Sequence, residues 1–149
     1  MDRRKLKKRT QAFALRVIRF VSGLPKNKVT NVLGYQLLCP EPFVPGPCTC
    51  RPGQVPKDQG PVEGLKPGTS IGANYREANR AESHNDFIHK IGIVEKEASE
   101  TQYWMELFEE ANIGDSEERR WLLQESGELL AIFTASGRTA KARRAGGRR

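Results

Sequence analysis

The chain of 149 residues lacks any long hydrophobic run. Only 37% of its residues are hydrophobic, the mean hydropathy is −0.63, and no stretch approaches the roughly 18 to 20 apolar residues that cross a bilayer. The apolar stretch after the basic N-terminus is interrupted by Arg16 and Arg19, which is not typical of a signal peptide. The sequence therefore predicts a cytoplasmic protein without a membrane segment, with room for one domain.

Cysteine and histidine, the usual ligands of zinc, are scarce. The three cysteines, Cys39, Cys48 and Cys50, are spaced C-x8-C-x-C with neither histidine close in sequence. This pattern lacks the paired C-x2-C that places four ligands around a structural zinc ion. An odd number of cysteines in a reducing compartment favours free thiols.

The two histidines also do not form a catalytic pattern. Asp86 and His89 supply one Asp-x-x-His, whereas a dinuclear carboxylate site in a bundle needs Glu-x-x-His from two helices. Ser83, His84 and Asp86 lie together at a helix start, where capping explains the serine and the aspartate. The sequence therefore predicts no catalytic residue, no metal, no cofactor and no enzymatic activity.

Charge is abundant and unevenly distributed. Residues 1–28 carry ten basic residues and one acid, residues 77–128 carry five basic residues and fourteen acids, and residues 138–149 carry six basic residues and no acid. Basic chain ends of this kind indicate contact with phosphate, with an acidic middle that faces solvent or pairs with them. A solvated basic surface that aids solubility is the alternative.

Hydrophobic periodicity predicts helices throughout and no strand. One helix spans the stretch from Leu6 to about Gly23, and a second begins near Val29 and stops at Cys39. Helical spacing resumes near Ile71, where Thr69 or Ser70 is a candidate cap. A third helix starts at Ser83 and ends before Gly114, and a fourth runs from Asp115 or Ser116 to about Lys141.

The segment 39–67 interrupts this pattern. Eight of its twenty-nine residues are proline and four are glycine, a composition incompatible with a helix or a central strand. The helical pattern before it continues after it, which indicates an insertion in the second helix. We therefore predict an all-α protein: an antiparallel four-helix bundle over residues 10–142, with an irregular insertion at 39–67, a basic arm at 1–9 and a basic disordered tail at 143–149.

Three blocks resemble a known family: QAFALRVIRFVSGLPK, GTSIGANYREANRAESHNDFIHKIGIVEKEASETQYWMELF and ELLAIFTASGRTAK. They are similar to the intervening-sequence proteins encoded within some bacterial 23S ribosomal RNA genes, the four helix bundle proteins. The resemblance covers roughly residues 10–38 and 68–142. In the family the QLL block runs almost directly into GTS-x-GANYREA, so the segment 39–67 is a departure from its pattern.

The resemblance implies a small four-helix bundle that assembles into a homopentameric ring, without enzymatic activity. It extends to the basic accessory protein of diversity-generating retroelements, which associates with nucleic acid and a reverse transcriptase. RNA or DNA, a polymerase-type protein and further copies of the chain are therefore the expected partners.

The candidate phosphate-binding residues are the basic residues of both chain ends. No recognition helix, zinc finger or aromatic platform accompanies them, so they would contact phosphates without reading sequence. The chief candidates are Lys5, Lys8, Arg9, Arg16, Arg19, Lys26, Arg143 and Arg144.

Four aromatic residues are candidates for an interface between copies: Tyr75, Tyr103, Trp104 and Trp121. Trp104 lies one position before the core-facing Met105, which would place it at the flank of its helix. A wide core face within one subunit is the alternative explanation for these residues.

Overall fold

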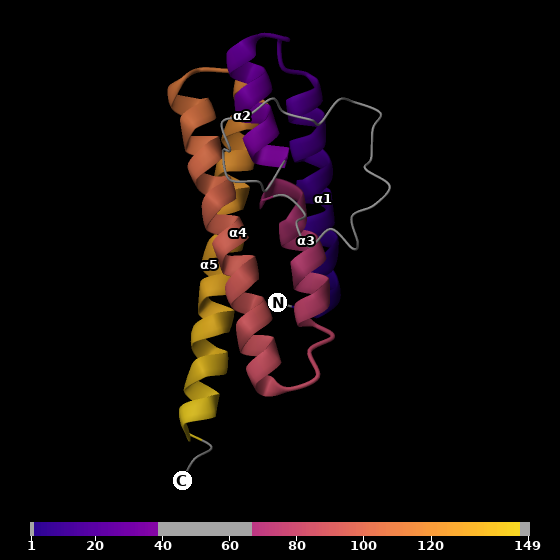
Figure 1. The fold of residues 1–149 in the computed structure, drawn as a ribbon, viewed down its shortest axis with the longest axis vertical. Coiled ribbons are helices and arrows are strands. Elements are labelled where there is room, and N and C mark those ends of the chain that lie inside the picture. Colours follow the sequence, from indigo (N-terminus) through magenta and orange to yellow (C-terminus); the bar gives the residue numbers. More distant parts are fainter. Residues whose placement is uncertain (1, 39–66, 147–149) are drawn as a thin grey trace, which may run out of the picture.

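The structure, a computed structural model, describes residues 2–38 and 67–146 of the chain. These residues form five helices and no strand: α1 (Arg3–Ser22), α2 (Lys28–Leu38), α3 (Pro67–Ala78), α4 (His84–Glu110) and α5 (Ser116–Gly146). The helices run alternately up and down the long axis, as Figure 1 shows. The predicted all-α bundle is confirmed.

Helices α2 and α3 together take the place of the bundle's second helix (Figure 1). A Cβ atom added to Gly68, at the start of α3, would lie 3.2 Å from the carbonyl oxygen of Leu37, near the end of α2. The chain therefore leaves the second helix and rejoins it at the same place. The prediction of an interrupted helix is confirmed at both flanks, while residues 39–66, including all three cysteines, lie outside the described residues.

Small residues let α1 and α3 approach closely. A Cβ added to Gly72 would lie 3.4 Å from Thr10 Oγ1, and one added to Gly68 would lie 2.9 Å from Val17 Cγ1. These glycines are one helical turn apart, so they form a continuous strip of backbone against α1. Their lack of a side chain is what permits this contact.

The helix starts follow the predicted capping chemistry. The Ser83 hydroxyl accepts a hydrogen bond from the Asp86 N–H at 3.1 Å, and Asp86 Oδ2 accepts one from the Glu82 N–H, also at 3.1 Å. At the start of α5, Asp115 Oδ1 accepts from the Glu118 N–H at 2.8 Å. Each bond satisfies a backbone donor that the helix leaves without a partner.

The apolar residues that recur at helical spacing along α4 and α5 form much of the core. Phe108 and Phe133 are completely buried, and the core of α4 and α5 also includes Ile91, Val94, Ala98, Met105, Leu122 and Leu129. Phe20 of α1 meets Phe108 edge-on, with ring centroids 5.2 Å apart. The described residues include no helix that is long and apolar enough to cross a membrane.

Three boundaries differ from the prediction. The supposed arm at 1–9 is helical from Arg3, because Asp2 caps the helix and Leu6 is buried in the core. The supposed tail is helical as far as Gly146, since alanine and basic residues favour the end of a helix and neither glycine nor proline lies between Gly137 and Gly146. Helix α3 starts at Pro67, a favourable first position, so Thr69 and Ser70 lie inside it and do not cap it.

Candidate nucleic-acid interface

Arg9, one of the predicted phosphate-binding residues, forms ion pairs with α5. Its Nη2 atom donates to Glu125 Oε2 at 2.7 Å and also to Glu128. The hydrogen bond with Glu125 raises the pKa of Arg9 above its ordinary value, although burial acts in the opposite direction. Arg9 is therefore neutralised within the bundle by a residue 116 positions away in the sequence.

Arg16 is held in a similar way two turns further along α1. Its Nε atom donates to Glu118 Oε1 at 2.6 Å, which raises the pKa of Arg16, and its guanidinium carbon lies 3.7 Å from the centroid of the Trp121 ring. The Trp121 ring in turn lies 6.4 Å from that of Phe13. Arg16 and Trp121 thus hold α1 against α5 within the subunit.

The other six predicted cations behave differently. Each is exposed, and none forms an ion pair within the part of the chain that the structure describes. Arg19 and Lys26 lie near the turn between α1 and α2, while the other four lie at the opposite end of the bundle. Those four are Lys5, Lys8, Arg143 and Arg144.

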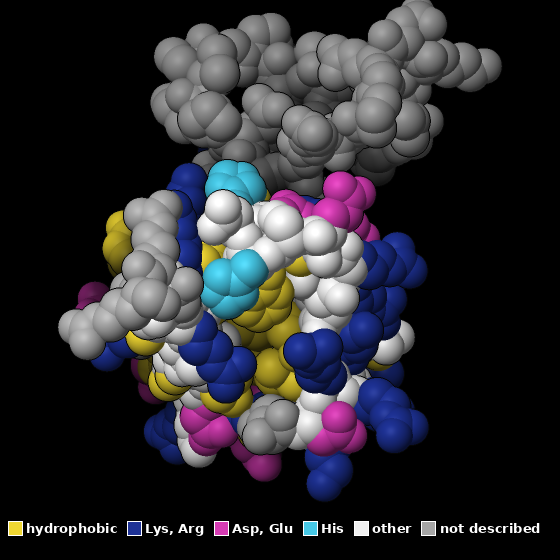
Figure 2. Space-filling model, turned by 90° about the horizontal axis from the view of Figure 1, so that it is seen from below, with side chains coloured by type: hydrophobic (Ala, Val, Ile, Leu, Met, Phe, Trp, Pro, Cys, Tyr) yellow, Lys and Arg dark blue, Asp and Glu magenta, His cyan; other side chains and the backbone are white. Residues whose placement is uncertain are grey.

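Figure 2 views the molecule along its long axis from below, from the end at which α5 ends and towards which the start of α1 points. Lys and Arg side chains stand around a central apolar area, and the chain's two histidines lie beside it. His84 Nε2 is 2.8 Å from the carbonyl oxygen of Ala140, so the start of α4 is hydrogen-bonded to the C-terminal part of α5. This end therefore combines segments from both extremes of the sequence.

The four aromatic residues predicted to form an interface differ in how exposed they are. Tyr75 is buried, with its ring 5.3 Å from that of Phe133, so its assignment to an interface is wrong: it is a core residue of the subunit. Tyr103 and Trp104 instead pair edge-on, 5.1 Å apart, on α4. Tyr103 is 54% exposed, whereas Trp104, like Trp121, is partly buried against the core, so Tyr103 is the exposed aromatic residue of the four.

Other polar groups of the bundle have structural partners. Glu97 is partly buried on α4 and accepts a hydrogen bond from Ser70 Oγ at 2.6 Å. Burial raises the pKa of Glu97, and the bond from Ser70 only partly offsets this. Asp86 pairs with Lys90 at 2.9 Å, and the hydrogen bond from Lys90 lowers the pKa of Asp86. Among the described residues, no three His, Cys, Asp or Glu side chains gather as a metal site would require.

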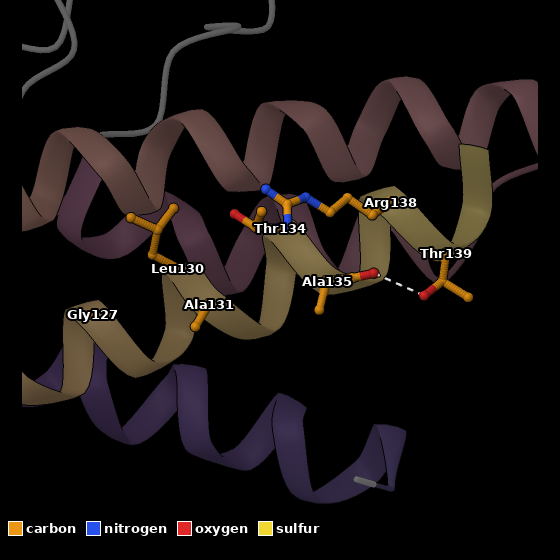
Figure 3. A pocket seen from close by; sticks show the side chains of 7 residues that line it. All are labelled: Gly127, Leu130, Ala131, Thr134, Ala135, Arg138 and Thr139. Carbon is orange, nitrogen blue, oxygen red and sulfur yellow. Dashed lines mark hydrogen bonds between the residues drawn. The ribbon is translucent and has the colours of Figure 1, made fainter. Parts of the chain in front are cut away.

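The surface of the described residues also has two shallow hollows. One follows the outer face of α5, where Arg138 is the single charged side chain among mostly small neighbours, as Figure 3 shows. The other lies between the α1–α2 turn and the α4–α5 turn, beside Val29 and Ile113. Neither brings together the convergent polar groups that fix a small ligand.

The sequence analysis missed one important residue. Arg119 is buried, with only 3% of its side-chain surface exposed. It bonds to the turn between α4 and α5, so its role is to hold that turn. The sequence shows it only as one of two adjacent arginines after an acidic pair, and nothing there separates it from Arg120.

Comparison with known proteins agrees with the fold. The family model described as 23S rRNA-intervening sequence protein matches residues 65–135. A crystal structure of a protein of unknown function from the S23 ribosomal protein family of Bacteroides thetaiotaomicron is similar, with 28% sequence identity and a TM-score of 0.66. The alignment covers 93% of this chain and 99% of that one. A search of the curated proteins finds no significant match.

Proposed function

Taking the chain as a relative of the 23S rRNA-intervening sequence proteins, we propose that it is a non-catalytic, oligomeric bundle that binds RNA or DNA through phosphate contacts. The observation that carries the proposal is the exposure of Lys5, Lys8, Arg143 and Arg144 without an acidic partner among the described residues. The net charge of +7 adds long-range attraction for a polyanion.

Binding of this kind follows from simple electrostatics. Lysine and arginine side chains on helices displace condensed counterions from the nucleic-acid backbone, and the released ions drive association. The described helices present no side-chain set arranged to read base edges, so the contacts position the nucleic acid without selecting its sequence. The protein would therefore bind many sequences with similar affinity.

A salt titration tests the proposal. We expect the full chain to bind a generic RNA at low salt, and the logarithm of the binding constant to fall linearly with the logarithm of salt concentration. The slope should be about −0.7 to −0.9 for each phosphate contacted. Fluorescence anisotropy of a labelled RNA measures it. No binding at low salt, or an affinity that salt leaves unchanged, would rule out the phosphate-contact mechanism.

An adaptor for another protein, such as a polymerase, is the second candidate, and one observation favours a protein-contact surface. Tyr103 is exposed on α4 beside the partly buried Trp104, and aromatic side chains are enriched at protein interfaces. In this case the nucleic-acid titration would show no binding. The same pair is also suited to contact between copies of the chain in the proposed homopentamer.

The native mass of the full chain tests the oligomer and the insertion together. We expect a pentamer, and we expect the same number of subunits after residues 39–66 are shortened to two residues, because Leu37 and Gly68 already lie close together. Shortening a loop changes its closure entropy only logarithmically. Mass photometry or light scattering gives the result. A monomeric full chain would refute the oligomer, and a pentamer formed only by the shortened chain would show that the insertion blocks assembly.

A further inference from the structure

We infer that nucleic acid binds at one end of the bundle, built from the first two turns of α1 and the last turns of α5, and that the preferred ligand is double-helical. We call this region the cationic end and define it by the basic residues of 3–8 and 138–144. The inference rests on the proposed function and specifies both the site and the form of its ligand.

Ion pairs between α1 and α5 fix how the two basic segments lie relative to each other. Arg16 pairs with Glu118 and Arg9 pairs with Glu125, so the numbering falls along α1 as it rises along α5. The helices are therefore antiparallel, and the start of α1 points towards the same end as the C-terminal half of α5 (Figure 1). At a rise of about 1.5 Å per residue, the last turns of α5 continue roughly 10–20 Å beyond the start of α1, so a ligand that contacts both segments must extend along the bundle.

The cationic end carries an uncompensated charge. Its two segments include nine basic residues and no acid, and Asp2, just before the first segment, caps α1 and accepts a hydrogen bond from the Arg4 N–H. The positive end of the α1 dipole adds to this field. Next to the α3–α4 turn, Glu77 and Asp86 pair with Arg80 and Lys90, and the exposed Glu82 is the acid of this turn that offsets part of the positive charge.

The opposite end of the bundle is different. Arg19, Lys26 and Lys28 are exposed there, but the α4–α5 turn and the helix ends beside it also carry exposed acids that form no ion pair among the described residues: Glu110, Asp115 and Glu117. Lys28 and the turn residues Asn112 and Gly114 line the same hollow, which places the two turns side by side. The cations at this end therefore have acidic as well as basic neighbours. They attract a phosphate backbone less strongly than cations without acidic neighbours would.

The side chains at the cationic end favour a duplex over a single strand. Proteins that bind single strands stack bases on exposed aromatic rings, but near this end Tyr75 is buried and Phe87 is partly buried against the core. The exposed Tyr103 belongs to the other half of α4. Apart from the exposed rings of His84 and His89, the described residues of this end offer charge and not stacking, so the surface gains most from the higher charge density of a double helix, about one phosphate per 1.7 Å of axis.

Two charge-matched variants of the full chain test the site. One replaces Lys8, Lys141 and Arg144 by glutamine, and the other replaces Arg19, Lys26 and Lys28 by glutamine. Each removes three positive charges from the net charge of +7. All six side chains are exposed, so both variants should fold like the original, which circular dichroism and thermal melting verify.

The probe is a 20-base-pair duplex of RNA or DNA, with one of its strands alone for comparison, titrated at several salt concentrations. We expect the first variant to bind the duplex at least tenfold more weakly at about 0.1 M salt, with a salt slope smaller by roughly 3 for each subunit in contact. The second variant should stay within about threefold of the original protein, because its cations face neighbouring acids. A charge-preserving variant, Lys8→Arg with Lys141→Arg and Arg144→Lys, should retain binding.

The outcomes distinguish a failure of the proposed site or ligand form from a failure of the proposed nucleic-acid binding. Equal weakening by both variants, or weakening only by the second, would overturn the cationic end as the site while nucleic-acid binding stands. Tighter binding of the single strand than of the duplex would overturn the preferred ligand. No binding of either nucleic acid by the original chain at low salt would overturn the proposed function itself, and this inference with it.

Discussion

Replacement of Arg119 by alanine is expected to destabilise the bundle by about 3 kcal/mol, because removal of one partner from a buried ion pair leaves the others without a counter-charge or donor. For a chain of this length, that loss lowers the melting temperature by roughly 6–12 °C. The Arg119 side chain is only 3% exposed, but its partners Glu109 and Asn112 are partly or fully exposed, so water replaces some of the lost hydrogen bonds and the cost stays at the low end for a buried ion pair.

The expectation follows from the contacts of the guanidinium group. Its Nε donates to Glu109 Oε2 at 2.6 Å, and its Nη2 donates to Asn112 Oδ1 at 2.7 Å. Its Nη1 donates to the carbonyl oxygens of Gly114, at 2.9 Å, and Ile113, at 3.2 Å. One side chain thus ties the end of α4, the turn and the start of α5 together.

The neighbouring arginine provides a matched control. The Arg120 side chain is 76% exposed, and its Nε lies 3.8 Å from Glu109 Oε1, so Arg120→Ala should change stability by less than about 0.5 kcal/mol. Thermal and urea unfolding of both variants measure the difference. If the two substitutions cost the same, the buried hydrogen bonds of Arg119 do not hold the turn.

The second large effect is expected at Gly114, in the same turn. Gly114 has φ of +83°, a conformation that costs a residue with a Cβ about 1–2 kcal/mol. A Cβ there would also lie 2.6 Å from Phe20 Cε2 and 2.9 Å from Leu24 Cδ2. Because the rings and methyl groups of the core must move, Gly114→Ala should destabilise the protein by about 2–4 kcal/mol in all.

Replacement of Gly92 by alanine should change the stability of the protein in the opposite direction. Gly92 lies in the interior of α4, and a Cβ added there meets nothing within 4 Å among the described residues. Gly92→Ala should therefore stabilise the protein by about 0.5–1 kcal/mol, since alanine loses less backbone entropy in a helix. Chemical denaturation of the two variants compares them directly. If both substitutions, or neither of them, destabilise the protein, the explanation given for the special role of Gly114 is wrong.

Helix positions and the main core residues could be predicted because both depend on local spacing. Phe13, Val17, Met105 and Phe133 recur at helical intervals, and the structure buries all four. The ends of α1 and α5 were predicted less well, because charge composition suggested solvated arms. The burial of Leu6 and the helix-favouring sequence up to Gly146 decided otherwise.

The candidate site was only partly predictable. The sequence marks Lys8, Arg9 and Arg16 as members of one cationic helix face, and nothing in their local pattern distinguishes them. The structure places Glu118 and Glu125 beside two of them and leaves the third exposed. The difference arises from the antiparallel register of α1 and α5, which joins residues more than a hundred positions apart.

By itself, the amino-acid sequence determined the helices, the caps of α4 and α5 and the position of the break in the second helix, because each of these depends on residues within a few positions of one another. Only the tertiary structure decided that Tyr75 packs on Phe133, that Arg119 is buried, and that the two basic segments share one end of the bundle. Those features depend on which helix faces meet and at what level, and close packing of the core sets both.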